Sequence, residues 1–293
     1  MVDIIREQNK EWALNKLIAQ RVTYSKAKKI RIISVIVIII SLFIEALNFM
    51  SLPFIKSECS LKVSIVATIL IFIISGLEKW SDSIQERAAK IQQDFDCKLF
   101  GIQHNPYILD DDINSIVIDA EKKDPSIREQ VRNWYTDEIN RYSYPYSALA
   151  CQQQNIGWNR NLSKKYLRLL QYILGVNLLV IVFLFILLKR NWNEYELNEY
   201  WNLGNIAVIF VKAIVLKTCS MTKQIREQTE FLEQESPIFS DINNNDLNRI
   251  PDILYRIQNK IFEFRKNHKP IPDMFYRYHR WSEETNSRKR LIR

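Results

Sequence analysis

Two stretches of the chain carry side chains that could bind a nucleotide. The first, Tyr142–Tyr166, alternates aromatic, amide and basic residues and contains no carboxylate. Aromatic rings stack on nucleobases, amides hydrogen-bond to base edges, and cationic side chains pair with phosphates. An alternative is that the amides cap and cross-link helices, while the basic residues flank a membrane span. The candidate ligand residues here are Gln152, Asn155, Trp158 and Arg160.

The second stretch, Ala19–Lys29, belongs to an amphipathic helix expected over residues 4–29. Its helical spacing places Arg21, Tyr24 and Lys28 on one face. One interpretation is a cytoplasmic pre-membrane helix whose basic residues lie at the lipid headgroups. The other is that this face contacts an anionic ligand or a neighbouring subunit. We therefore take these three residues as further ligand candidates.

Catalytic chemistry is not indicated by the sequence. The three histidines, His104, His268 and His279, do not stand at metal-ligand spacings, and the four cysteines form no CxxC pair. No HExxH, GxSxG or phosphate-binding GxxxxGK[ST] pattern occurs. We expect no enzymatic activity, no catalytic residues, no metal and no cofactor.

Long apolar segments must position these stretches. Leu169–Leu188 holds twenty consecutive residues without a charge, and a helix of that length spans roughly 30 Å, the thickness of the bilayer hydrocarbon. Further spans are expected at about 32–54, 61–80 and 203–221. The expected fold class is all-α: an integral membrane protein with four transmembrane helices in two hairpins, and a cytosolic helical domain built from the central insert and the termini.

Basic residues orient these spans. Lys and Arg number 8 before the first span, 13 between the second and third, and 15 from Lys217 onward, but only 1 and 2 in the two short loops. The positive-inside rule therefore places both termini and the central insert in the cytoplasm. The expected domains are an N-terminal amphipathic cytosolic helix (1–31), a transmembrane hairpin (32–80), a cytosolic helical insert (81–166), a second transmembrane hairpin (167–221) and a C-terminal cytosolic helical region (222–293).

Three polar residues within the expected spans, Glu45, Asn177 and Lys212, are candidates for an intramembrane function. A charged side chain in a span is costly and usually faces protein or water rather than lipid. Lys212 and Asn177 fall at nearly the same expected depth. Lys212 either lines an aqueous path, or is satisfied by Asn177 and backbone carbonyls or reaches Glu45. Glu45 either is protonated or snorkels, or packs in an oligomer or faces a pore.

Four stretches together resemble the SMODS-associating four-transmembrane effector family of bacterial CBASS-type cyclic-oligonucleotide antiphage systems. They follow the family's order along nearly the whole chain. Gln153 and Gln154 stand where the resemblance leads us to expect a basic residue, which argues against a phosphate contact at that position. The stretches are REQN (Arg6–Asn9) with AQRVTYSKAK (Ala19–Lys28), AAKIQQDFDCKLFGI (Ala88–Ile102), CQQQNIGWNRNLSKKY (Cys151–Tyr166) and IQNKIFEFRKNHKPIPDMFYRYHR (Ile257–Arg280).

The resemblance implies an effector that stays silent until a CD-NTase-type cyclase makes a cyclic di- or trinucleotide second messenger. The effector would lie in the cell inner membrane, bind this nucleotide and form a homo-oligomer. It would then permeabilise the lipid bilayer as a pore-forming protein, causing abortive infection as an antiviral defence. Two alternatives stay open. One is a small transporter or channel subunit without nucleotide gating, with Lys212 and Glu45 as substrate or ion sites. The other is a membrane scaffold whose tail docks proteins.

Overall fold

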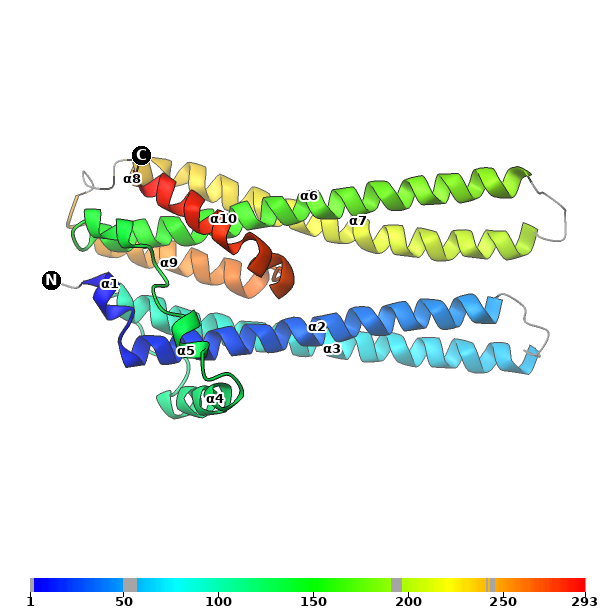
Figure 1. Cartoon of the computed structure of the whole chain (residues 1–293), viewed down its shortest axis with the longest axis horizontal. Coiled ribbons are helices and arrows are strands. Elements are labelled where there is room, and N and C mark those ends of the chain that lie inside the picture. The colour runs from blue at the N-terminus through cyan, green and yellow to red at the C-terminus, as the bar shows by residue number, and fades with distance from the viewer. Residues whose placement is uncertain (1–2, 50–56, 191–196, 241, 243–245, 293) are drawn as a thin grey trace. The chain divides into compact units, whose positions relative to one another are not determined.

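The computed structural model describes residues 3–49, 57–190, 197–240, 242 and 246–292. Every regular element among them is a helix, in agreement with the expected all-α fold class (Figure 1). In chain order they are α1 (Ile4–Glu7), α2 (Glu11–Phe49), α3 (Ser57–Leu99), α4 (Asp110–Lys123), α5 (Ile127–Gln130), the 3-10 helix η1 (Asp137–Arg141), α6 (Tyr146–Arg190), α7 (Leu197–Gln234), α8 (Ser236–Ser240), α9 (Ile250–Asn267) and α10 (Asp273–Ile292).

The chain divides into two compact units. Unit 1 consists of Met1–Lys28, Ser81–Lys164 and Gln224–Arg293, and unit 2 consists of Lys29–Trp80 and Lys165–Lys223. Helices α2, α3, α6 and α7 each contribute one part to each unit. The stretches expected to form the two transmembrane hairpins fall within unit 2.

Unit 2 presents large apolar side chains to its surroundings. Phe72, Leu179 and Leu216 are all exposed, which is unusual for helices that face water. By length and composition, one helix among the described residues can cross a membrane. It lies within Tyr146–Phe183, and 6% of its apolar window is buried. The expected third span overlaps this helix. Side chains of the other three expected spans are described only in part. Two ranges lie outside the described residues: 50–56, where the first expected span passes into its loop, and 191–196, in the second expected outer loop.

The N-terminal helix differs from its expected bounds. The sequence predicted one helix over residues 4–29, whereas α1 ends at Glu7 and α2 then runs from Glu11 to Phe49. At the break the side chain of Asn9 donates to the carbonyl of Ile5, one turn earlier, at 3.1 Å. Gln8 donates to the carbonyl of Tyr135 at 3.2 Å and accepts from its backbone N–H at 2.7 Å. The residues between α1 and α2 therefore bind a distant loop.

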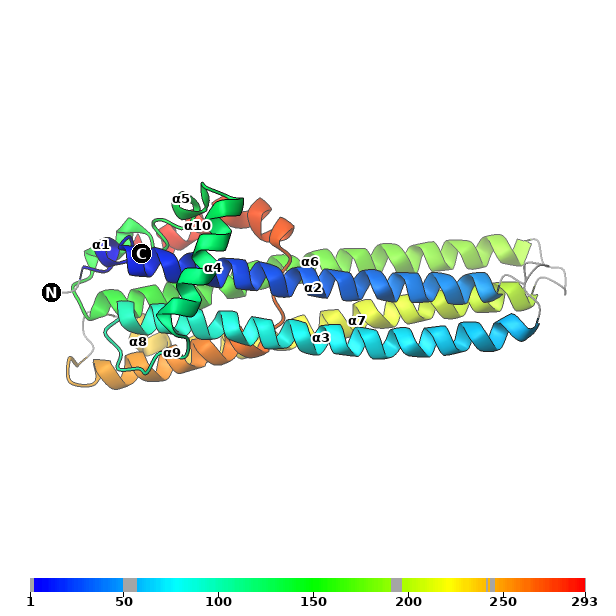
Figure 2. The same ribbon diagram turned by 90° about the horizontal axis from the view of Figure 1, so that it is seen from below.

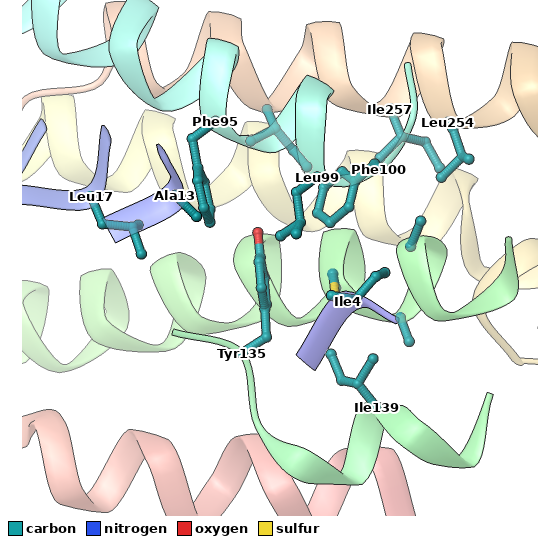
Figure 3. Packing of buried hydrophobic residues seen from close by; sticks show 14 of the residues in the cluster. Ile4, Ala13, Leu17, Phe95, Leu99, Phe100, Tyr135, Ile139, Leu254 and Ile257 are labelled. Atoms are coloured by element: carbon teal, nitrogen blue, oxygen red, sulfur yellow. The ribbon is translucent and has the colours of Figure 1, made fainter. Parts of the chain in front are cut away.

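The core of unit 1 gathers apolar side chains from several helices. Leu17 of α2, Phe95 of α3, Leu149 of α6 and Ile257 of α9 are fully buried. Figure 3 shows the ring of Tyr135, from the loop before η1, among these helices. This loop is the one bound by Gln8, so the N-terminus and the central insert share one core.

Helix α9 follows the pattern expected from its sequence. Pro251 stands at its start, where a missing N–H costs nothing. The helical spacing of four apolar residues after Pro251 predicts a helix with these residues pointing inward. All four are buried in α9, so this prediction is confirmed. They are Leu254, Ile257, Ile261 and Phe264.

The region before α6 is less regular than expected. Asp124 followed by Pro125 is a sequence pattern that predicts the start of a helix. The observed helix α5 has only four residues, however, and the 3-10 helix η1 follows after a loop. Ile127 and Val131 are nevertheless buried. Asn133 has a φ of 52°, and its side-chain oxygen accepts from Asn9 at 2.9 Å. A left-handed residue ends a helix, so the chain cannot continue as α5.

Candidate functional site

A buried carboxylate organises the polar part of unit 1. Asp96 of α3 is 0% exposed and forms an ion pair with Arg265 of α9. The hydroxyl of Tyr135 donates to its Oδ1 at 2.8 Å, and Gln258 donates to its Oδ2 at 3.2 Å. A buried charge needs such partners, because an unpaired one would cost several kcal/mol. Burial, together with the nearby Asp96, raises the pKa of Tyr135 and keeps its proton in place.

Two of the candidate ligand residues belong to this network. Gln152 of α6 is buried, and its side-chain nitrogen donates to the carbonyl of Leu254 at 2.9 Å and to Gln258 at 3.2 Å. Asn155 donates to the hydroxyl of Tyr135 at 2.8 Å. Both amides link α6 to other parts of the core, an arrangement that fits the cross-linking alternative. The Oε1 atom of Gln152 is buried without a hydrogen-bond partner among the described residues.

Tyr24 lies near the same network. Burial is the main cause that raises the pKa of its phenol. The charge of Arg265 lowers this pKa, and the charge of Asp96 raises it. Tyr24 and Arg21 were expected on one face of a helix. In the structure they interact with different parts of unit 1. Arg21 donates to the side chain of Gln130 at 2.8 Å and to its carbonyl at 3.3 Å. Arg21 thereby reaches the end of α5.

Lys28 binds the start of α10. It forms an ion pair with Asp273, and its side chain is 17% exposed. Ser25, three residues earlier, donates to the other oxygen of the same carboxylate at 3.0 Å. Lys28 also lies over the ring of Tyr276, with its Nζ atom 5.9 Å from the ring centroid. One face of α2 therefore holds the first turn of α10.

Trp158 of α6 reaches the same tyrosine. The ring centroids of Trp158 and Tyr276 are 6.4 Å apart, with 37° between their planes. Tyr276 is thus contacted by an aromatic ring from α6 and a cation from α2. Arg280 lies one turn further along α10, and its Nε atom donates to Glu284 at 2.7 Å. We call Arg21, Lys28, Trp158, Tyr276 and Arg280 the basic-aromatic cluster.

The cluster carries closely spaced positive charges. Burial lowers the pKa of Arg21, and the charge of Arg280 lowers it further, because two nearby cations disfavour each other. Asp273 and Asp124 offset this effect in part. Cationic groups of this kind pair with phosphate oxygens, and the faces of two aromatic rings can stack on a base. The arrangement has the chemical groups needed to bind a nucleotide.

Sequence reasoning identified only part of this cluster. Arg21, Lys28 and Trp158 were candidates, whereas Tyr276 and Arg280 were not. Their i, i+4 spacing on an aromatic-basic helix is a signal that could have found them. Arg160, also a candidate, is half-buried, and its Nε atom has no hydrogen-bond partner among the described residues.

The intramembrane candidates are described unevenly. Asn177 donates to the carbonyl of Ile173, one turn earlier in its own helix, at 2.7 Å. Lys212 is exposed. The side chain of Glu45 lies outside the described residues. Among the described residues, no group of three or more His, Cys, Asp or Glu side chains could hold a metal ion.

Comparison with known proteins identifies the family. No solved structure matches the chain. A protein of Bacillus cereus (strain VD146), named "Probable CBASS effector molecule", is 30% identical over 168 residues, which is 56% of this chain and 56% of that protein. The chain thus spans about half the length of this curated relative. Residues 2–291 match the SMODS-associating 4TM effector domain. Because that match covers nearly the whole sequence, the chain belongs to the SMODS-associating 4TM effector domain family and is a membrane protein.

Proposed function

We propose that this protein is a membrane effector of bacterial antiphage defence that senses a cyclic di- or trinucleotide through unit 1. Binding leads the protein to oligomerise and to permeabilise the inner membrane. Family membership and the printed name of the Bacillus cereus relative support the effector role. The observation that carries nucleotide sensing is the basic-aromatic cluster, which joins α2, α6 and α10.

The cluster matches the two chemical parts of a cyclic oligonucleotide. Arg21 and Arg280 supply guanidinium groups for bidentate contacts with a phosphodiester. A bound phosphate also relieves the repulsion between these two cations. The rings of Trp158 and Tyr276 supply faces for a base.

In this proposal, ligand binding weakens the attachment of the start of α10 to α2. The carboxylate of Asp273 accepts hydrogen bonds from Lys28 and Ser25, the donors that a phosphate oxygen would use. A phosphate that competes for Lys28 loosens the start of α10. Moving a population from 1:99 to 99:1 requires about 5.5 kcal/mol of differential binding, so several such contacts must act together.

The first experiment measures binding. The full chain in detergent is titrated by calorimetry with a panel of cyclic di- and trinucleotides. Replacing Arg21→Glu or Arg280→Glu is expected to weaken binding at least about tenfold, because each removes a hydrogen bond to a charged group. Arg226→Glu is the matched control, since Arg226 lies on an exposed face of α7 and pairs with Glu230. Equal losses in all three variants would contradict the cluster as the site.

The second experiment measures the outcome in cells. Dye entry is followed in bacteria that co-express the protein with its cognate CD-NTase-type cyclase. Permeability is expected to rise only when both are present and the cyclase is active. If the protein reaches the membrane and permeability stays unchanged, the proposed function is wrong.

A further inference from the structure

One face of α10 carries large side chains that are exposed. Met274, Tyr278 and Trp281 are 80%, 83% and 78% exposed. They follow one another by four and three residues, so they form a single stripe along the helix. The opposite side of α10 packs within unit 1, where it contacts η1. An aromatic stripe this exposed is typical of a surface that a partner covers.

The net charge beside this stripe is positive, since Glu284, three residues after Trp281, pairs with Arg280. Arg277 and Lys289 are exposed on α10, and Arg288 reaches Glu138 only at 4.0 Å. A second copy of the same face would bring like charges together, which disfavours an α10–α10 contact. The partner surface is therefore expected to be acidic.

Helix α4 presents an acidic surface on the same unit. Asp111 and Asp119 are exposed on the face that carries the exposed side chain of Ile118, and Lys122 is an exposed cation at the C-terminal end of the same face. The helix as a whole is acidic, because it begins with three aspartates. Leu109, which precedes the helix, is 75% exposed. The inner face of α4 contacts α5. The outer face of α4 thus combines apolar side chains with negative charge, as a partner for α10 requires.

We propose that α10 of one copy docks on α4 of a second copy. The inference deepens the oligomerisation step of the proposed function and rests on it. Figures 1 and 2 show α4 and α10 as separate helices, and both belong to unit 1. Two different surfaces then meet, so a pair of copies keeps one free α10 face and one free α4 face. Such a heterologous contact propagates into a ring or an open filament.

Cysteine cross-linking tests the contact directly. Two differently tagged full-length chains, one with Tyr278→Cys and one with Ile118→Cys, are co-expressed, and the isolated membranes are oxidised with copper phenanthroline. Both chains also carry Cys59→Ser and Cys219→Ser, while the native Cys97 and Cys151 are buried. A disulfide that joins the two differently tagged chains is expected. No such disulfide is expected when only one of the two cysteine variants is expressed. Absence of the mixed disulfide, or self-linking of the Tyr278→Cys chain, would overturn the proposal.

Charge reversal supplies the second measurement. Arg277→Glu with Lys289→Glu on α10, or Asp111→Lys with Asp119→Lys on α4, is expected to reduce the mixed disulfide at least about tenfold when carried by both chains. All four changes together restore opposite charges and should restore the cross-link. Failure of this rescue, with all variants present in the membrane at equal amounts, would overturn the proposal.

The outcomes separate this inference from the proposed function. Dye entry on cyclase co-expression with no mixed disulfide means that the effector works through another surface. A mixed disulfide without cyclase-dependent dye entry means that the contact exists and the proposed function is wrong.

Discussion

Lys28 of α2 binds Asp273, the first residue of α10, across 245 positions of the chain. This pair and the contact of Ser25 with the same carboxylate hold the helix that carries Tyr276 and Arg280. The start of α10 is therefore fixed by the same α2 face that supplies Arg21 to the basic-aromatic cluster.

The first prediction concerns this attachment. Asp273→Asn removes the charge that Lys28 binds, and a partly exposed pair of this kind contributes up to about 1 kcal/mol. Hydrogen–deuterium exchange should become faster in the first turns of α10, and nucleotide affinity should rise by up to about fivefold, because the phosphate no longer competes with a carboxylate. Asp252→Asn, at an exposed position in the first turn of α9, is the control. Unchanged exchange in α10 would show that the pair does not hold the helix.

The second prediction concerns the buried carboxylate. Asp96→Ala leaves the Arg265 guanidinium buried without its ion pair, which costs about 3–5 kcal/mol of unfolding free energy. Denaturant unfolding of the detergent-solubilised chain, followed by circular dichroism, measures the loss. Lys269→Ala breaks the exposed pair with Asp82 and should cost less than about 1 kcal/mol. Similar losses for the two variants would mean that Asp96 is not the centre of the core network.

How much of this arrangement the sequence could predict depends on how far apart in the chain the contacting residues lie. The buried face of α9 was predictable, since Pro251 and the helical spacing of Ile257 and Ile261 are local signals. The break between α1 and α2 was not, because Gln8 bonds to Tyr135, 127 residues away. For the same reason the sequence indicated a basic face around Arg21 but could not place α10 beside it.

The third prediction concerns alkaline pH. Burial, with the charges of Asp96 and Asp94, raises the pKa of the Cys97 thiol from 9.0 to about 12. Above about pH 9 the unfolded chain loses this proton while the folded chain keeps it, so the folded state binds more protons and stability falls as pH rises. The decline continues up to the folded pKa.

Equilibrium unfolding between pH 8 and 11 (roughly the window below that folded pKa) checks this prediction. Cys97→Ala should make the decline in stability shallower but not remove it, because other buried groups with raised pKa values, such as Tyr135, still contribute. Cys219→Ala should leave the decline unchanged, because Cys219 is exposed. Identical slopes in the native chain and in Cys97→Ala would contradict the assignment to Cys97.

The last prediction separates the two roles assigned to tryptophans in unit 1. Trp158 contacts Tyr276 in the basic-aromatic cluster, and Trp281 lies on the exposed stripe of α10. Trp158→Ala should lower nucleotide affinity by about 5- to 150-fold, since stacking on one base contributes roughly 1–3 kcal/mol. It should leave the cross-link between the Tyr278→Cys and Ile118→Cys chains unchanged. Trp281→Ala should keep the affinity and lose most of the cross-link, because it removes a large apolar contact. Calorimetry and membrane cross-linking are carried out on both variants. If both tryptophans affect the same measurement, the ligand site and the contact between copies are not separate surfaces.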